Sequence, residues 1–324
     1  MSITTDALAA EYRAITESCG LFDRSQQGKL ALTGAGAAEF LQGQVTNDVQ
    51  GLEPGAGCYA AFLTPKGKML GDLRILDADD EILLDTERVA LQELFNMIRR
   101  FSLGYQVELH KRTLECGLES LVGPQADEAV SRAFGGDAVP GAAEHSHVAV
   151  GPVRAIRTDV GVDLLFVADE LEAVRAAVLG AGAVPVSAAA AECVRIERGR
   201  PRYGVDLDDS VIPQEAGLNE RAVSFTKGCY VGQETVARLF YRGKPNRALR
   251  GLRSATPIEV GAELTLDGRA VGQVTSAAVS PRLGPIALAL VRREAPPGTS
   301  VEAGASVEAG ASVSAEVCEL PFSI

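Results

Sequence analysis

The stretch Lys227-Gly228-Cys229-Tyr230-Val231-Gly232-Gln233-Glu234-Thr235-Val236 carries the most information in this chain of 324 residues. It places the thiol of Cys229 beside a lysine and between two glycines, ahead of a segment that is predicted to be helical. Glycine permits a positive φ or a close approach to a ligand, and a helix N-terminus with a nearby cation favours the thiolate. The alternative is a small buried cysteine at a tight turn. We favour a reactive thiol, because the flanking glycines and the lysine fit it.

Four further blocks accompany this stretch along the chain. They are Gly43–Val49, Gly57–Asp72, Arg195–Gly204 and Val271–Ser276, the last followed by Ser280-Pro281. In sequence and in order, the five blocks resemble the YgfZ family, the folate-binding relatives of the glycine cleavage T-protein that serve iron–sulfur proteins. One block alone would be a weak signal, whereas five in register across nearly the whole chain are a strong one.

Strand and helix patterns alternate without a strict β-α-β rhythm up to residue 244, which indicates an α+β fold. Beyond Pro245, short strands follow one another between Gly and Pro turns, as is typical of a small all-β barrel or sandwich. We therefore expect two domains, an α+β region at 1–244 with two intertwined subdomains and a β-barrel at 245–324. The resemblance implies a ring-like T-protein fold, with a central folate cavity that the barrel closes.

Apolar residues at helical spacing predict helices over residues 5–18, 36–45, 87–100, 169–179 and 188–197. Strands are predicted at 28–33, 59–63, 69–76, 81–84, 105–109, 118–122, 147–157 and 163–167. The segment 123–151 is rich in Gly, Ala and Pro and is predicted to be a mobile connection. The repeat of Val301–Ser306 at Val307–Ser312 predicts a lengthened hairpin.

The chain carries 43 acidic and 31 basic residues, so its formal charge of −12 repels nucleic-acid backbones at long range. We therefore expect no nucleic acid among its partners. No apolar run approaches the roughly 18 residues that a membrane span needs. The first 20 residues, with Asp6, Glu11 and Glu17 among them, fit neither a secretory signal nor an Arg-rich transit peptide. These features predict a cytoplasmic protein that does not enter a membrane.

Six cysteines lie far apart, at positions 19, 58, 116, 193, 229 and 318, and none has the C-x-x-C spacing of a zinc or cluster site. We therefore expect no metal site, no disulfide framework and no iron–sulfur cluster of the protein's own. Apart from Cys229, each has apolar or small neighbours and is predicted to lie in the core or in a strand.

Glu197 is our candidate for holding the pterin ring of a reduced folate, because a carboxylate can accept two N–H donors from the edge of such a ring. It ends a predicted helix just before Gly199. A solvated charge is the alternative, and the resemblance implies that this glutamate faces the pterin. Tyr59 and Tyr203 either offer flat faces to the ligand rings or are core tyrosines.

Asp72 lies inside a predicted strand, where a carboxylate is disfavoured unless it pairs or reacts. The related T-proteins carry two adjacent aspartates here, one of which attends the nitrogen that accepts the one-carbon unit. In this chain Gly71 replaces the first, which leaves one acid for catalysis. T-proteins also usually have an aspartate where Cys229 stands. Both departures argue against aminomethyl transfer and favour a YgfZ-type protein with a functional cysteine.

Lys227, the one cation beside Cys229, either lowers the pKa of the thiol or binds the folate tail, and Asn47 either stabilises a turn or lies beside the ligand. We expect a tetrahydrofolate-binding protein, not a typical enzyme, that uses Cys229 to help assemble or repair iron–sulfur clusters in client proteins. The enzymatic alternative is a folate-dependent aminomethyltransferase or demethylase that uses Asp72. A folate-binding regulator without chemistry is the third reading.

Overall fold

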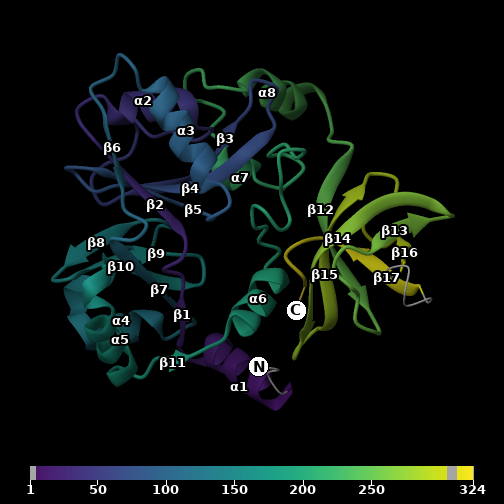
Figure 1. Ribbon diagram of the computed structural model, residues 1–324. Coiled ribbons are helices and arrows are strands. Elements are labelled where there is room, and N and C mark those ends of the chain that lie inside the picture. Colours follow the sequence, from purple (N-terminus) through teal and green to yellow (C-terminus); the bar gives the residue numbers. More distant parts are fainter. Residues whose placement is uncertain (1–4, 305–311, 324) are drawn as a thin grey trace.

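The computed structural model describes residues 5–304 and 312–323, which form two sheet-based bodies and a barrel (Figure 1). The two sheets lie one above the other on one side, the barrel lies on the other side, and helix α6 (Ala188–Glu197) lies between them. This mixed architecture with a closed C-terminal barrel confirms the predicted α+β fold. None of the described helices combines the length and the apolar character needed to cross a bilayer.

The upper sheet has five antiparallel strands in the order β3-β4-β5-β2-β6. They are β2 (Gly28–Thr33), β3 (Gly57–Leu63), β4 (Met69–Asp77), β5 (Ile82–Thr86) and β6 (Glu108–Lys111). Helices α2 (Ala37–Gln44) and α3 (Leu91–Phe101) pack on this sheet. In α3, residues three and four apart share a face, so Leu94 and Ile98 both enter the core that Phe40 and Leu41 of α2 complete.

The lower sheet has six strands in the order β11-β1-β7-β10-β9-β8. They are β1 (Gly20–Asp23), β7 (Cys116–Val122), β8 (His147–Val150), β9 (Val153–Arg157), β10 (Gly161–Val167) and β11 (Val184–Pro185). The helices of this body are α4 (Ala126–Phe134), η1 (Gly136–Ala138), η2 (Ala168–Glu170) and α5 (Leu171–Gly180). The strand predicted over 147–157 is therefore a hairpin, which turns at Gly151 with a φ of 56°.

The mobile connection predicted at 123–151 is wrong. This segment holds α4 and η1, and Ala126, Ala129 and Val130 of α4 are buried in the core of the lower body. Alanines at helical spacing bury a narrow stripe, which a search for large apolar side chains overlooks. The content of Gly, Ala and Pro that indicates a loop is therefore compatible here with a packed helix.

Four further helices are described, and one of them, α6, packs against the barrel. They are α1 (Thr5–Glu17), α6 (Ala188–Glu197), α7 (Asn219–Ala222) and α8 (Gln233–Arg242). Helix α6 starts where the hydroxyl of Ser187 accepts a hydrogen bond from the N–H of Ala190, as N-caps commonly do. Near its end, Arg195 donates to Ser276 of the barrel at 2.7 Å, so α6 fixes the barrel against the sheets.

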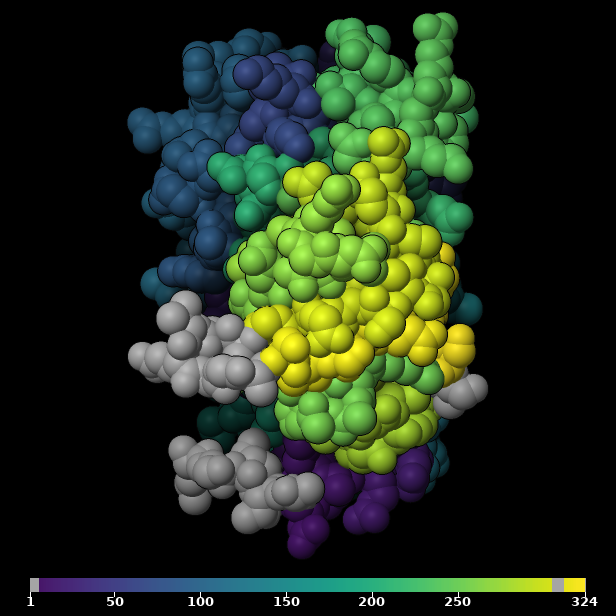
Figure 2. Space-filling model, turned by 90° about the vertical axis from the view of Figure 1, so that its right-hand side faces the viewer, coloured from purple at the N-terminus to yellow at the C-terminus, as the bar shows by residue number. Residues whose placement is uncertain are grey.

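The barrel is closed by six strands in the order β12-β15-β14-β13-β16-β17. They are β12 (Arg247–Ser254), β13 (Glu263–Leu266), β14 (Arg269–Ser280), β15 (Gly284–Arg292), β16 (Ser300–Ala303) and β17 (Val313–Cys318). Figure 2 shows the barrel in front, above the N-terminal helix and below the green segment that contains α8. Strands β16 and β17 pair on either side of the predicted repeat, whose residues 305–311 lie outside the described part of the chain.

Candidate functional site

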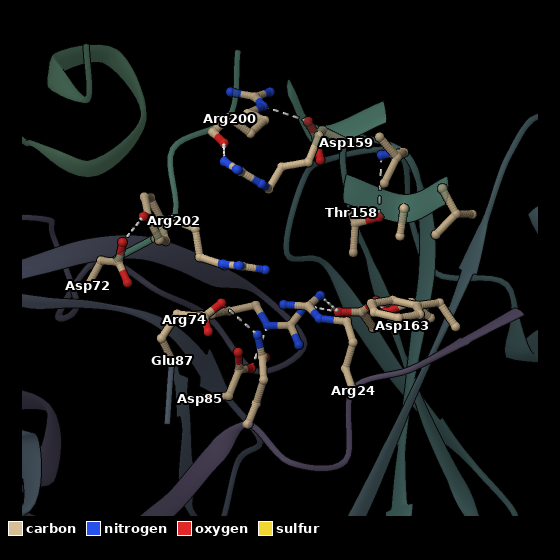
Figure 3. Close-up of a pocket in the computed structure, with 18 of the residues that line it drawn as sticks. Arg24, Asp72, Arg74, Asp85, Glu87, Thr158, Asp159, Asp163, Arg200 and Arg202 are labelled. Atoms are coloured by element: carbon tan, nitrogen blue, oxygen red, sulfur yellow. Dashed lines mark hydrogen bonds and ion pairs between the residues drawn. The ribbon is translucent and has the colours of Figure 1, made fainter. Parts of the chain in front are cut away.

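A cavity of about 820 Å³ lies between the two sheets, α6 and the segment that follows α6 (Figure 3). Its volume falls within the range of roughly 300 to 1,000 Å³ that small-molecule sites occupy. Strands β3, β4 and β5 line it from the upper sheet, and β1, β7 and β10 line it from the lower sheet. Asp72, Tyr59 and Tyr203, three of the residues singled out from the sequence, are among its lining.

A buried ionic network joins the two sheets at one wall of the cavity. Arg74 of β4 donates to Asp85 at 2.6 Å and to Asp163 of β10 at 2.8 Å. Asp163 also accepts from Arg24 at 3.2 Å and from Ser120 at 2.6 Å. Burial alone would raise the pKa of Asp163, but the two arginines hold it below the ordinary value. The wall therefore keeps its charges paired at neutral pH.

Asp72 presents a carboxyl group to the same cavity. Its Oδ2 accepts a hydrogen bond of 2.6 Å from the hydroxyl of Tyr59, and its Oδ1 has no hydrogen-bond partner among the described residues. Burial raises the pKa of Asp72 to about 6, although the bond from Tyr59 acts in the opposite direction. An acid with such a pKa exchanges a proton near neutral pH, as a general acid or base must.

Arg221, Glu144 and His145 complete this end of the cavity. The guanidinium of Arg221 lies 5.3 Å from the centre of the Tyr59 ring and forms an ion pair with Glu144. His145 adopts a left-handed backbone with a φ of 69°, and burial lowers the pKa of its imidazole to about 4. The imidazole is therefore neutral at physiological pH and can donate and accept hydrogen bonds.

Several polar atoms around the cavity lack partners. Eight buried side-chain nitrogen and oxygen atoms of the described residues have no hydrogen bond, and four of them belong to residues that line the cavity. These four are Gln27 Oε1, Arg74 Nη2, His145 Nδ1 and Arg221 Nε. Buried polar atoms are usually satisfied, so this clustering indicates a site whose polar groups serve a ligand.

Gly71 shows why only one acid occurs at this point of β4. A Cβ built on Gly71 would lie 2.5 Å from the ring of Phe62 and 2.7 Å from the Cβ of Ala90. Successive residues of a strand point to opposite faces, so a side chain at 71 would enter the core while Asp72 faces the cavity. The core of this chain thus leaves no room for a second aspartate.

Cys229 lies outside the cavity, on the loop that precedes α8. It is the one exposed cysteine of the six, all of which are described, and the other five are buried or half-buried. Burial raises the pKa of Cys19 to about 11 and that of Cys58 and Cys193 to about 12, so these thiols stay protonated. The expectation that those five lie in the core or in strands is confirmed.

Lys227 fastens the Cys229 loop to the upper body. Its ammonium group donates to the backbone carbonyls of Gln42, Val45 and Asn47 at 2.7 to 2.8 Å. Burial lowers its pKa to about 8, and it does not line the cavity. Since all three N–H donors of the ammonium are used within the chain, Lys227 acts as an anchor in this structure.

Asn47 connects that anchor to the cavity. Its carbonyl accepts from Lys227, and its side-chain amide donates to the carbonyls of Tyr59 at 2.8 Å and of Arg221 at 3.2 Å. Both of these residues line the cavity. Hydrogen bonds through Asn47 therefore link Lys227, on the loop that carries Cys229, to Tyr59, whose hydroxyl bonds Asp72.

Comparison with known proteins agrees with this architecture. The N-terminal domain of glycine cleavage T-proteins matches residues 1–227, and their C-terminal barrel domain matches residues 247–323. The chain belongs to the glycine cleavage T-protein family. Among solved structures, it is similar to the glycine cleavage system aminomethyltransferase T of Bartonella henselae, with 25% identity and a TM-score of 0.87. That alignment covers 98% of this chain and 89% of the Bartonella protein.

Two curated relatives are similar to this chain over most of the length of this chain. An aminomethyltransferase of Synechococcus sp. (strain RCC307) is 30% identical over 311 residues, which is 91% of this chain and 85% of the relative. A chloroplastic transferase-like protein of Arabidopsis thaliana, At1g60990, is 31% identical over 263 residues, or 78% of this chain. The match spans only 60% of the Arabidopsis protein.

Glu197 is the predicted ligand that the structure places elsewhere. The Tyr12 hydroxyl shares its one hydrogen bond between the two oxygens of the Glu197 carboxylate, at 2.9 and 3.0 Å, and the carboxylate also accepts from Ser280 and from Arg282 at 3.1 Å. It joins α1, α6 and the barrel and is not among the side chains that line the cavity. On α6 the cavity face holds Glu192 and Arg195, whereas Glu197, two residues further, points to the other side. The predicted contact with a pterin thus has no support from this geometry.

Tyr203 contributes a ring to the cavity and packs between the core clusters of the upper body. Its hydroxyl lies 3.5 Å from the carbonyl of Met69, and burial raises its pKa to about 12. Tyr203 thus lines the cavity and also packs against the core, and its contact with a ligand stays a prediction.

Several cavity residues of this T-protein family member were not identified from the sequence, namely Arg74, His145, Asp163 and Arg221. Arg74 and Asp163 stand inside apolar strands, which is the signal that singled out Asp72. Applying it to them would have found both. His145 and Arg221 lie in irregular segments with no comparable pattern. No group of three or more His, Cys, Asp or Glu side chains in the described residues is arranged to hold a metal ion.

Proposed function

We propose that this protein binds a reduced folate, tetrahydrofolate, in its cavity and assists the assembly or repair of iron–sulfur clusters in client proteins, with Cys229 as its reactive group. The observation that carries the proposal is the pairing of an exposed thiol with a polar cavity through Lys227 and Asn47. We further propose that the protein works in the cytoplasm and that its domains meet between residues 244 and 245.

The cavity has the chemistry that a reduced folate needs. A pteridine is flat and rich in N–H donors and in acceptors, and the unpartnered atoms of the cavity include donors on Arg74 and Arg221 and an acceptor on Gln27. The rings of Tyr59 and Tyr203 offer apolar faces. When bound, a reduced folate supplies a ring nitrogen that can carry a one-carbon unit.

Asp72 can hold or release a proton at its free Oδ1. With a pKa of about 6, its carboxyl group populates both protonation states near neutral pH. Tyr59 holds the other oxygen, and this fixes the direction in which Oδ1 faces. Asp72 is therefore the acid that we propose to act beside a bound folate.

The surroundings of Cys229 suit encounters with another protein. The thiol is exposed, and Phe240 and Tyr241 of the neighbouring α8 are exposed as well. Phe240 stacks on Phe225, which belongs to the same loop as Cys229, with ring centres 3.7 Å apart. An exposed thiolate can exchange with a disulfide or coordinate iron, and both reactions would serve a damaged or incomplete cluster.

A folate-dependent aminomethyltransferase or demethylase is the second candidate function. Asp72, with its raised pKa inside the cavity, favours it, and the Synechococcus and Bartonella relatives carry the name aminomethyltransferase. Against it stands Gly71, because the core excludes the second aspartate that T-proteins carry there.

Two measurements separate the candidates. In cells that lack the protein, activity of a [4Fe–4S] client enzyme after oxidative stress should be restored by the wild type and not by Cys229→Ser. Purified protein should bind tetrahydrofolate in a calorimetric titration. Turnover of an aminomethyl-loaded lipoyl carrier protein that persists in Cys229→Ala and disappears in Asp72→Asn would overturn the proposal in favour of the transferase.

A further inference from the structure

Two of the acids that line the cavity lack a basic partner. Each of the other lining carboxyl groups forms an ion pair with an arginine, and these are Asp23, Asp85, Glu144, Asp159, Asp163 and Glu192. In the part of the chain that the structure describes, Asp72 and Glu87 form no ion pair. They accept hydrogen bonds from neutral side chains instead, Asp72 from Tyr59 at 2.6 Å and Glu87 from Gln27 at 3.2 Å.

These two unpaired acids are neighbours across β4 and β5. In this antiparallel pair of strands, Arg74 lies opposite Asp85, and residues two apart on a strand share a face. Two positions before Arg74 stands Asp72. Two positions after Asp85 stands Glu87, just beyond the end of β5. Asp72 and Glu87 are therefore the next pair of positions on the cavity face, and Figure 3 shows them on the same side of the cavity.

A hydrogen bond fixes the end of β5 at this place. The hydroxyl of Thr86 donates to the backbone carbonyl of Asp72, so the chain leaves β5 directly beside that residue. Position 71 cannot supply a second acid, because its side chain would meet the core. Glu87 thus brings a second carboxyl group to the cavity from the neighbouring strand.

The charge of Glu87 makes the ionisation of Asp72 less favourable. Burial is the main cause of the raised pKa of Asp72, and the negative charge of Glu87 acts in the same direction. The titratable groups that face Asp72 from the elements around it are Tyr59, Asp85, Glu87 and Tyr203. None of these groups is a cation, so they leave the proton of Asp72 in place.

A buried guanidinium on the same wall has a free donor. The side chain of Arg74 is 7% exposed and uses Nε for Asp85 and Nη1 for Asp163. Its Nη2 is buried and has no partner among the described residues, and Arg74 belongs to the lining of the cavity. Since buried donors are usually satisfied, this atom indicates that the wall with the two acids contacts a ligand.

From this arrangement we infer that Asp72 and Glu87 act as an acid pair in the cavity. Glu87 is the positioning residue of the pair, because its charge keeps the proton on Asp72. Protonated Asp72 can then donate a hydrogen bond from Oδ1 to an acceptor atom of a bound ligand. The contact with a folate rests on the proposed function, whereas the pair itself does not.

Carbon-13 NMR of the full-length protein, labelled at its aspartate carboxyl carbons, tests the pair. The Asp72 signal, identified by its loss in Asp72→Asn, should titrate at about pH 6 in the wild type. Glu87→Gln removes the charge and keeps the size of the side chain. It should lower this midpoint by roughly half a pH unit or more, the effect of one like charge on a neighbouring strand. Glu108→Gln, at an exposed glutamate of β6 in the same sheet, is the matched control and should leave the midpoint unchanged.

A conservative variant separates charge from shape. Glu87→Asp keeps a carboxylate on a shorter side chain, so its midpoint should stay closer to that of the wild type than to that of Glu87→Gln. An unchanged midpoint in Glu87→Gln would refute the pair, whether or not the protein binds a folate. Equal midpoints in Glu87→Asp and Glu87→Gln would also refute it, because the effect would then not depend on the charge.

Calorimetric titration with tetrahydrofolate between about pH 5 and pH 8 tests the contact with the ligand. If protonated Asp72 donates to the folate, the affinity should fall as the pH rises through the Asp72 midpoint, and Glu87→Gln should move this fall to lower pH. An affinity that does not change with pH would refute the donor role. Absence of binding together with the expected NMR shift would refute the proposed function and leave the acid pair intact.

Discussion

Replacing Asp72 by asparagine should change how the stability of this protein depends on pH. In the folded chain, burial raises the pKa of Asp72 to about 6, whereas an unfolded aspartate has the ordinary value of 3.8. At pH values between 3.8 and about 6, the unfolded chain has released the proton of Asp72 that the folded chain still holds. Rising pH therefore destabilises the fold through Asp72, and this loss of stability is complete above about pH 6.

The magnitude follows from the difference between the two pKa values. At 1.36 kcal/mol per pH unit, the wild type loses about 3 kcal/mol through Asp72 on going from acid to neutral pH. Between pH 4 and pH 7.5, where measurement is practical, the linkage relation gives about 2.4 kcal/mol. Asparagine keeps the shape of the side chain and cannot ionise, so the variant lacks this loss.

Urea unfolding at pH 4 and at pH 7.5 measures the effect. The free energy of unfolding of Asp72→Asn minus that of the wild type should be about 2.4 kcal/mol larger at pH 7.5 than at pH 4, which means that the variant gains stability relative to the wild type. Asp80→Asn, at an exposed aspartate in a turn, controls for the substitution itself. A relative stability of Asp72→Asn that is equal at the two pH values would refute the claim that this carboxyl group is buried and proton-retaining.

Three other predictions concern residues around the site. In the native protein, a thiol reagent should label one cysteine quickly, and Cys229→Ser should abolish that fast phase, because the other five thiols are buried or half-buried; a remaining fast phase would contradict this burial. Glu197→Ala should lower the free energy of unfolding by about 3 kcal/mol, because it leaves the buried Tyr12 and Ser280 hydroxyls without their hydrogen-bond acceptor. The affinity of the folded variant for tetrahydrofolate should stay within twofold of the wild type. A tenfold loss of affinity would show that Glu197 contacts the ligand. Gly71→Asp, which restores the adjacent acids of T-proteins, should lower stability by about 3 kcal/mol or more in thermal unfolding, because its Cβ would meet Phe62; an unchanged midpoint would contradict the tight packing.

The fold was predictable because its signals are local and repeated. Five sequence blocks in a fixed order identified the superfamily, and apolar periodicity placed α6 at residues 188–197, as observed. One difference from expectation has a physical cause as well. The end of a helix predicts that Glu197 faces a ligand, whereas helical rotation turns Glu197 away from the face that carries Glu192 and Arg195.

The site was less predictable, because its groups come together only through tertiary pairing. Arg74 and Asp163 are 89 residues apart and meet across two sheets, and no spacing rule links them. His145 and Arg221 reach the cavity from irregular segments, where periodicity carries no information. What the sequence did offer was a charged residue inside an apolar strand, and that signal identified Asp72.

The positions of Asp72 and Cys229 suggest why this chain keeps an acid inside the cavity and has a thiol where T-proteins usually carry an aspartate. A side chain at 71 would face the core, so the cavity keeps the single carboxyl group of Asp72 at this point of the strand. The thiol stands outside, where a macromolecule can reach it and where a folate enclosed in the cavity would not compete for it. Asn47 touches both regions, through the carbonyl of Tyr59 on one side and the ammonium of Lys227 on the other. A ligand that contacts Tyr59 would therefore also stabilise the loop that presents the thiol, and under our proposal this link would give a bound folate a part in the cluster chemistry without placing it at the reacting sulfur.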